Sequence, residues 1–331
     1  MKPSRRIVNL LGEYGIVWAT IVLFLLLAVT TPAFRSGTNL SNVLDQNAIV
    51  LIVAVFATIT LIAGGFDISL SATFILAPLV AIRVAEHVQS GLLMLLVGAV
   101  VGCVIGLVNG LIVSKAQINS FIVTLATSLV IFGIAYLVSD GSILRLPDST
   151  MRALATTKVL GITTSTWIAI VCIGIASVLL HRTRFGRYVF AVGGNQEAAR
   201  LAGVPVDRVI AFAFILGGMA AGLAGSLNAI RTLTAQASDD FSLVFTVIAA
   251  IVVGGTSIAG GNGAIWRTVV GVFFIAFLGN GFNLNGIDPV VQRIVQGLVI
   301  LFALGIEAYG RRRRTTEPLT PGPFIWIEAV G

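Results

Sequence analysis

The sequence predicts an all-α polytopic membrane protein, and two observations support this fold class. Hydrophobic residues make up 57% of the 331 residues and charged residues only 11%, whereas a soluble domain carries about 25% charged residues. The mean hydropathy is +1.01. Apolar stretches also approach or reach the roughly 20 residues that a helix needs to cross a bilayer. These stretches are continuous, which excludes the alternating pattern of a membrane β-barrel.

About ten spanning helices are expected, at 15–31, 47–63, 69–84, 92–113, 121–138, 166–181, 209–230, 241–259, 265–283 and 290–308. They form one transmembrane domain over 15–308, between an N-terminal segment, 1–14, and a basic tail, 309–331, that is predicted to be disordered. The first apolar stretch has no small-residue cleavage site, so it is interpreted as an uncleaved helix. An even number of spans puts both termini on one side, where 14 of the 21 Lys and Arg residues then lie. The positive-inside rule makes that side cytoplasmic.

Several functional classes are excluded by what the sequence lacks. The net charge is +7, but the basic residues are scattered between spans without interleaved aromatic residues, so nucleic-acid binding is not expected. Cys103 and Cys172 lie inside apolar runs without metal-ligand spacing and are interpreted as core residues. There is no P-loop, no nucleophilic or zinc signature and no intramembrane chain of carboxylates and histidines. No catalytic residue, metal or cofactor is therefore expected, and a transporter of this kind is a channel or takes energy from a partner.

Glycines at spacings of three or four residues mark two helix faces. The fourth span carries Gly98, Gly102, Gly106 and Gly110, and the seventh carries Gly218, Gly222 and Gly225. Residues at these spacings share one face of a helix, and the missing side chains let a neighbouring backbone approach closely. Both faces predict tight helix–helix packing.

The connection 182–208 lies on the predicted cytoplasmic side and contains signals for one short helix. Asn195 is a good N-cap, Glu197 suits the first turn, and Gly203 suits the position after the last turn. They predict a helix over 196–202, which is too short to be stable alone. It therefore needs support from its own bundle or from a docking partner, and the local pattern does not decide between a docking element and a plain surface helix.

A tentative pathway site consists of polar groups at membrane depth: Gly65, Asp67, Ser69, Asn109, Asn228, Asn280 and Asn283. Asp67 follows a Gly-Gly pair between two apolar runs, and a carboxylate at such depth usually has a function or a partner. It either shapes a helix break along the pathway, or caps the helix that begins near Ile68. The amides suit hydrogen bonds to a sugar, or equally to neighbouring helices. A second glycine-broken segment, VVGGTSIAGGNGAIWR, hints at paired interruptions.

Taken together, these motifs resemble the membrane permeases of bacterial ABC importers of the ribose and related monosaccharide type. The ordered series is AGGFDISLSA, GLVNGLIVSKAQINSFIVTL, FGRYVFAVGGNQEAARLAGVPVDRV, AIVVGGTSIAGGNGAIWRT, and NGFNL followed by VQGLVILFA. It covers most of residues 60–305. Branched-chain amino-acid permeases are more distant relatives. The sequence departs from the family at Phe66, Leu70 and Ser71, where isoleucine, valine and glycine are usual.

The resemblance implies a type II ABC importer-like permease in the bacterial cytoplasmic (inner) membrane. The implied partners are a cytoplasmic ABC ATPase, a periplasmic or lipid-anchored sugar-binding protein, and a second copy in a homodimer or a paralogous permease. It also implies that the 196–202 helix is the coupling helix seated on the ATPase. The residues that match the family pattern there are Gly193, Gly194, Asn195, Glu197, Ala198, Ala199 and Arg200.

The sequence thus leads to the hypothesis of a non-enzymatic permease subunit. It forms the pathway for a monosaccharide, a ribose-like pentose or a related sugar, while a separate subunit hydrolyses ATP. The alternative is a stand-alone secondary transporter or channel for a small polar solute. A membrane-embedded enzyme or scaffold would require a catalytic constellation that is not found.

Overall fold

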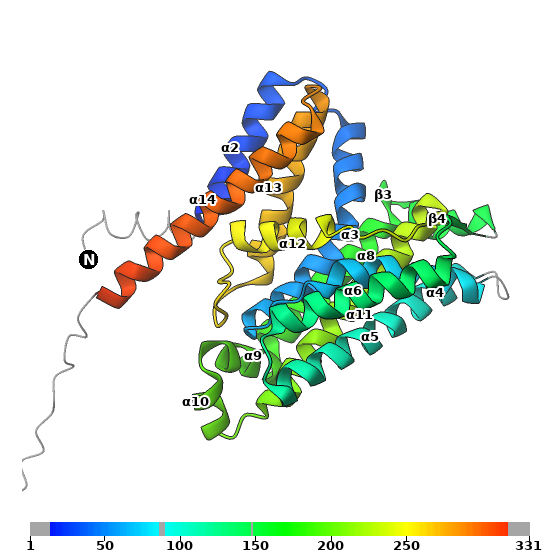
Figure 1. The fold of residues 1–331 in the computed structure, drawn as a ribbon. Coiled ribbons are helices and arrows are strands. Elements are labelled where there is room, and N and C mark those ends of the chain that lie inside the picture. Colours follow the sequence, from blue (N-terminus) through cyan, green and yellow to red (C-terminus); the bar gives the residue numbers. More distant parts are fainter. Residues whose placement is uncertain (1–13, 86–89, 147, 317–331) are drawn as a thin grey trace, which may run out of the picture.

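Helices form most of the protein in the computed structural model, which describes residues 14–85, 90–146 and 148–316 (Figure 1). The longer helices are α2 (Gly15–Thr30), α3 (Gly37–Ile62), α4 (Ser69–Ala85), α5 (Gly91–Ala116), α6 (Ser120–Ser139), α8 (Thr164–Arg182), α11 (Val206–Thr232), α12 (Ser242–Val253), α13 (Ile265–Leu284) and α14 (Pro289–Thr316). The shorter ones are a 3₁₀ helix, η1 (Ser149–Arg152), and the helices α7 (Ala153–Thr156), α9 (Arg184–Gly194) and α10 (Gln196–Leu201).

Four two-residue strands lie in the connections, a detail that the all-α prediction did not include. Strand β1 (Leu144–Arg145) pairs antiparallel with β4 (Thr234–Ala235), and β2 (Lys158–Val159) pairs antiparallel with β3 (Ile162–Thr163). They lie at the opposite end of the helices from α10 (Figure 1). The two ends are called the strand end and the α10 end below.

The membrane-protein class is confirmed by the lengths of the helices. Within the described ranges, six helices are long and apolar enough to cross a membrane: α3, α5, α6, α8, α11 and α13. The shorter apolar helices α2, α4, α12 and α14 occupy the places of the other predicted spans. The total of ten spans stays a prediction.

Three boundaries differ from the sequence prediction by more than five residues. Helix α3 begins at Gly37 rather than 47 because Ser36 caps it there, its side chain accepting a hydrogen bond from the Asn39 N–H. Helix α12 ends at Val253, where Gly254 and Gly255 (φ 84°) turn the chain. Helix α14 continues past 308 to Thr316, so the basic run 311–314 is helical. Residues 1–13, 86–89 and 317–331, which hold most of both predicted terminal segments, lie outside the described residues.

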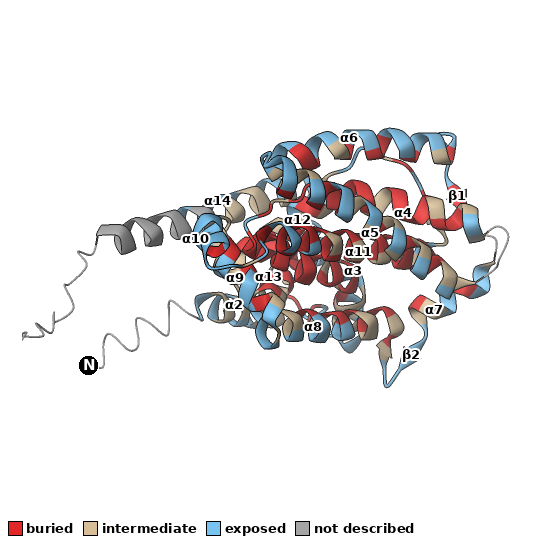
Figure 2. Ribbon diagram, turned by 90° about the horizontal axis from the view of Figure 1, so that it is seen from below, coloured by how far each residue is buried: buried red, intermediate tan, exposed pale blue. Residues whose placement is uncertain are grey.

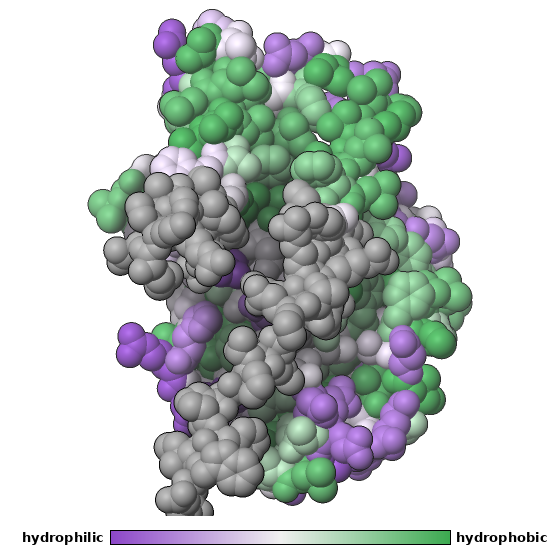
Figure 3. Space-filling view, turned by 90° about the vertical axis from the view of Figure 1, so that its left-hand side faces the viewer, coloured by the Kyte–Doolittle hydropathy of each residue, from purple (hydrophilic) through white to green (hydrophobic). Residues whose placement is uncertain are grey.

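The core of the bundle is built around α3 and α11, whose residues are mostly buried (Figure 2). Helix α3 contacts α8, α11, α12 and α13, and α11 contacts α3, α4 and α5. Helices α2, α5, α6 and α8 instead expose many large apolar side chains. In the space-filling view, large hydrophobic areas are visible on the surface, with hydrophilic side chains gathered mainly at its upper rim and lower part (Figure 3). Such exposed apolar faces fit contact with lipid.

The glycine faces pack as predicted. A Cβ atom at any of the four α5 glycines would overlap α11: Gly98 lies against Gly222 and Ser226, Gly102 against Gly218, Gly106 against Phe214, and Gly110 against Ala211. Gly218 and Gly222 of α11 lie in turn against the backbone of the α5 glycines. Gly225 instead lies against the Phe74 backbone of α4. The two faces are therefore largely the two halves of one α5–α11 interface, in which the backbones are in direct contact.

Candidate functional site

The α10 end is the first candidate site, and it begins with α9, which the sequence analysis did not predict. The Thr183 hydroxyl caps this helix by accepting a hydrogen bond from the Gly186 N–H at 3.2 Å. Gly186, Val189 and Val192 are buried, at three-residue spacing, while the opposite side of the helix is exposed. This amphipathic pattern is present in the sequence, and a search for short helical periods in the connection could have found it.

Helix α10 forms where the sequence predicted a helix. The Asn195 side chain accepts a hydrogen bond from the Ala198 N–H at 2.9 Å, and Gly203 follows the helix with a φ of 81°, which confirms both predicted ends. Ala199 is the buried residue of the helix, and Leu201 is 86% exposed. In Figure 1, α10 projects from the bundle. A leucine so exposed on a projecting helix presents apolar surface that a partner could cover.

The predicted docking residues fall into two groups around α10. Glu197 and Ala198 are exposed on it. The guanidinium of Arg200 pairs with the Asp207 carboxylate at 3.0 Å, and both side chains are half exposed, so this pair contributes little to stability. Gly193 and Gly194, in contrast, end α9: Gly193 lies against the Ile62 carbonyl and the Gly261 nitrogen, whereas Gly194 is exposed.

Three glycine pairs far apart in the sequence meet directly beneath α10. They are 64–65 after α3, 193–194 at the end of α9, and 260–261 between α12 and α13. The Gly261 N–H donates to the Ile62 carbonyl at 2.8 Å, and a Cβ at Gly193 would overlap that carbonyl oxygen and lie 2.6 Å from the Gly261 nitrogen. This contact of three segments is called the glycine junction. It joins the α9–α10 connection directly to both glycine-broken segments that the sequence singled out.

A buried polar cluster lies in the α3–α4 break. Asp67 Oδ1 accepts hydrogen bonds from the Ser69 N–H at 2.9 Å and from the Ser69 hydroxyl at 2.6 Å, and Asn109 Nδ2 donates to that hydroxyl oxygen at 2.8 Å. Asp67 is 6% exposed, and Ser69 and Asn109 are 1% exposed. The structure thus brings three predicted site residues together. Asp67 holds the turn that starts α4, as both interpretations of this residue allow.

Two hydroxyl groups on α6 accept hydrogen bonds from the backbone of the α3–α4 break, and the sequence analysis missed them. The Phe66 N–H donates to Ser120 Oγ at 2.9 Å, and the Ile68 N–H donates to Thr124 Oγ1 at 3.0 Å. These bonds satisfy backbone groups that a helix would otherwise satisfy internally, which matters where water is scarce. Gly65 completes the close packing, because a Cβ there would lie 2.7 Å from the Phe214 ring.

The other predicted amides lie apart from this cluster. Asn280 exchanges two hydrogen bonds of 2.9 Å with Asn39, which fastens α13 to α3. Asn283 is exposed and accepts a hydrogen bond from Gln292, and Asn228 is half-buried on α11. Asn280 therefore makes the interhelical hydrogen bond that was the alternative to a role in sugar contact.

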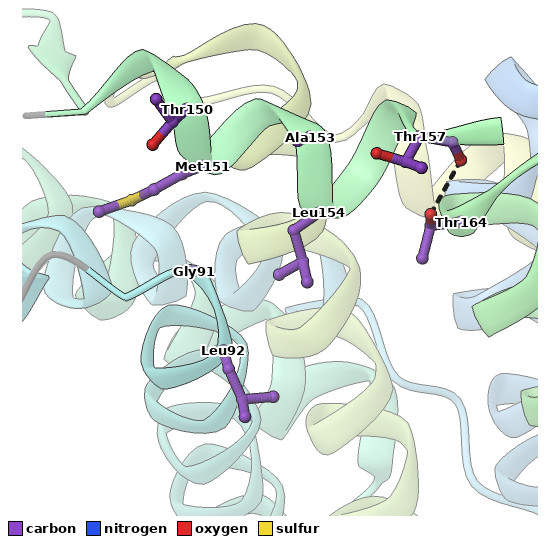
Figure 4. A pocket seen from close by; sticks show the side chains of 8 residues that line it. All are labelled: Gly91, Leu92, Thr150, Met151, Ala153, Leu154, Thr157 and Thr164. Carbon is purple, nitrogen blue, oxygen red and sulfur yellow. Dashed lines mark hydrogen bonds between the residues drawn. The ribbon is translucent and has the colours of Figure 1, made fainter.

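The strand end carries a small cavity and an exposed hairpin. The cavity has a volume of about 380 Å³ between α5, η1 and α7, and Met151 and Leu154 point toward the start of α5 at Gly91 (Figure 4). No charged residue lines it, and no predicted site residue is among those described around it. The β2–β3 hairpin turns at Leu160 and Gly161, both with positive φ, and Leu160 is 87% exposed.

The described residues offer neither a metal-ligating cluster nor a disulfide. Among the residues described, no group of three or more His, Cys, Asp or Glu side chains is arranged to hold a metal ion. Cys103 and Cys172 are free thiols, half-buried and buried. The features described at the site are a projecting helix, a glycine junction and a buried polar turn.

Comparison with known proteins assigns the chain to a family. Residues 39–304 match the family described as "Branched-chain amino acid transport system / permease component". The L-arabinose transport system permease protein AraH of Escherichia coli K12 is 34% identical over 304 residues, covering 92% of this chain and 93% of AraH.

Two ribose permeases are about as similar. The ribose import permease protein RbsC of Escherichia coli K12 is 33% identical, covering 87% of this chain and 91% of RbsC. RbsC of Bacillus subtilis strain 168 is 35% identical, covering 90% of this chain and 94% of its own length. No solved structure matches the chain at a significant level. These matches confirm the resemblance noted from the sequence motifs, and the chain belongs to the branched-chain amino acid transport system permease component family.

Proposed function

We propose that this protein is the transmembrane subunit of an ATP-binding-cassette importer that forms the translocation pathway for a monosaccharide. Relatives named for L-arabinose and for ribose match nearly the whole chain with similar identity, which supports a pentose or a related sugar as the solute. The chain itself is not an enzyme in this proposal. ATP is hydrolysed by a separate cytoplasmic ATPase subunit.

The observation that carries the proposal is the projecting helix α10 above the glycine junction. A helix of six residues is not stable alone, yet α10 is capped at both ends and exposes Glu197, Ala198 and Leu201. An ATPase subunit seated on this surface would move a helix that is tied, through Gly193, to Ile62 and Gly261. Movement of α10 on docking would then be transmitted to the α3–α4 and α12–α13 segments through backbone contacts rather than through flexible side chains.

The same geometry supports the pathway assignment. In the proposal, movement at the junction changes the α3–α4 break, and Asp67, Ser69 and Asn109 keep that turn intact while it moves. These residues are buried within one subunit, so they contact the sugar only in a conformation that opens the break. Asn228, Asn280 and Asn283 remain candidates for sugar contact on the basis of their amide chemistry alone.

The remaining partners belong to the same proposal. A sugar-binding protein docks at the strand end, and two copies of the chain, or one copy and a paralogous permease, surround the pathway. The protein is a multi-pass inner-membrane protein, with α10 and both termini on the cytoplasmic side. The ion pair between Arg231 and Asp45, at 3.5 Å, and the bond from the Thr163 hydroxyl to Asp45, at 2.7 Å, brace α3, α11 and β3 at the opposite surface.

The test is a pull-down of the detergent-solubilised protein with its ATPase, paired with sugar uptake in proteoliposomes. One variant replaces residues 195–202 with a Gly/Ser linker. The matched control replaces the exposed β2–β3 hairpin residues 158–161 in the same way, which alters a segment at the other end and leaves Thr163, the cap of α8, intact. We expect the first variant to lose the ATPase and ATP-dependent uptake, and the control to keep the ATPase.

Two results would contradict the proposal. Equal recovery of the ATPase with both variants would remove α10 as the docking element. Sugar uptake by the unmodified chain without any ATPase would instead favour a stand-alone transporter, and Asp67 would then be the residue to examine.

A further inference from the structure

A second feature of the α10 end is a groove on its outer side, between α9 and the first turns of α11. It has a volume of about 480 Å³, and its lining is almost entirely apolar. The Phe185 and Phe212 rings meet edge to face at 5.0 Å and form one wall. Tyr188 and Phe212 remain 37% and 42% exposed, so the groove is open.

The groove has a polarity gradient along α11. Arg208, Phe212 and Ile215 line it at spacings of four and three residues, which puts them on one face of the helix. Arg208 lies in the first turn of α11, and Ile215 lies about 10 Å further along the helix axis toward the middle of the span. A cation at the start of α11 is thus followed by apolar side chains further along the helix.

Two cations are not neutralised by the described part of the protein: Arg208, which lines the groove, and Arg184, which precedes the lining residue Phe185 on α9. Among the described residues, the guanidinium of Arg208 has no hydrogen-bond or ion-pair partner, and neither does that of Arg184, which precedes Tyr188 by one helical turn. The acidic neighbour Asp207 has its carboxylate on Arg200. Both free guanidinium groups are exposed, so they can bind an anion from outside.

We propose that this groove binds one anionic phospholipid, with the phosphate on Arg184 and Arg208 and an acyl chain along Phe212 and Ile215. Guanidinium groups bind phosphate oxygens in pairs of parallel hydrogen bonds, and basic pockets between membrane helices suit anionic headgroups. Tyr188 places an aromatic ring with a polar tip at the level of the headgroups, where such residues are favoured. The bound lipid would also support α9, which is not a membrane span and borders the groove.

The first experiment measures lipid binding to the purified chain by native mass spectrometry, with phosphatidylglycerol and phosphatidylcholine as probes. Arg208→Gln should weaken phosphatidylglycerol binding about fivefold, the factor that one basic residue contributes beside an anionic lipid surface. Arg187→Gln is the matched control, because it removes the same charge from α9 on the side away from Phe185. It should change binding less than twofold.

The second experiment identifies the occupant in the native membrane. A photoreactive phenylalanine analogue at position 212, where the native residue is already aromatic, should form an adduct with phospholipid. An adduct with the ATPase or with a second copy of the chain would overturn the proposal, because the groove would then be a protein interface. The proposal would also be overturned if Arg187→Gln and Arg208→Gln weakened phosphatidylglycerol binding equally, or if the protein bound phosphatidylglycerol and phosphatidylcholine equally.

Discussion

Gly193→Ala is the sharpest perturbation of the glycine junction, because its neighbour supplies the control. A Cβ at position 193 would overlap the Ile62 carbonyl oxygen and crowd the Gly261 nitrogen, whereas a Cβ at Gly194 has nothing within 4 Å. Neither glycine has a positive φ, so alanine fits the backbone at both positions. The two variants therefore differ in packing and in nothing else.

The size of the effect follows from the contacts. Overpacking against backbone costs about 1–3 kcal/mol, and loss of the Gly261–Ile62 hydrogen bond adds about 0.5–1.5 kcal/mol. In a helix interior, alanine is more favourable than glycine by about 1 kcal/mol, which offsets part of this cost. Gly193→Ala should therefore destabilise the junction by about 0.5–3.5 kcal/mol, while Gly194→Ala should leave it unchanged or stabilise α9 slightly.

Two measurements test this expectation together. Thermal unfolding of the purified chain should show a lower Tm for Gly193→Ala than for Gly194→Ala. The initial rate of ATP-dependent monosaccharide uptake in proteoliposomes, with the ATPase and the binding protein present, should fall severalfold for Gly193→Ala only. Indistinguishable Tm values and uptake rates for the two variants would refute the reasoning about the junction. A lower Tm with normal uptake would keep the packing but remove its role in coupling.

Three further predictions concern other parts of the structure. Gly102→Ala should lower the free energy of unfolding by about 1–3 kcal/mol, because a Cβ there overlaps the α11 backbone; Gly133→Ala, with nothing within 4 Å, is the control in the same unfolding assay. Leu160→Asn should keep the hairpin, since asparagine tolerates the left-handed turn, but should weaken binding of the sugar-binding protein, measured by surface plasmon resonance. Asp45→Asn should lower the Tm, because the Arg231 guanidinium, largely buried, loses its charged partner.

Each of these has a contrary outcome. Equal unfolding free energies of Gly102→Ala and Gly133→Ala would mean that α5 and α11 can move apart to accept a methyl group without loss of stability. Unchanged affinity after the Leu160 substitution would place the binding protein elsewhere on the strand end. An unchanged Tm for Asp45→Asn would show that the hydrogen bond from the Arg231 guanidinium to the Asp45 carbonyl, at 3.1 Å, is sufficient by itself.

Local signals account for the features that the sequence predicted well. Continuous apolar runs located the spans, and the Asn195 cap and Gly203 located α10 because both act on the nearest backbone groups. Four-residue glycine spacing predicted a packing face, but not that its main partner is the other glycine face. Spacing along one helix carries no information about which helix lies opposite.

Features that depend on several distant segments could not be predicted. The glycine junction joins residues 64, 193 and 261, and each glycine pair by itself reads only as a turn. The hydroxyls of Ser120 and Thr124 satisfy the α3–α4 break, yet in sequence they look like ordinary helix residues. Asn280 pairs with Asn39, which lies before the predicted second span, so an amide alone did not reveal its partner.

The weak attachment of α10 to its own protein has an evolutionary consequence. Ala199 is the residue through which this helix is buried, and Glu197, Ala198 and Leu201 face outward. Substitutions at the outward positions leave the core of the bundle untouched, so they are free to follow changes in whatever surface binds there. If an ATPase docks on α10 as proposed, a permease of this design could exchange one ATPase subunit for another by altering a few residues, while the helices of the bundle stay as they are.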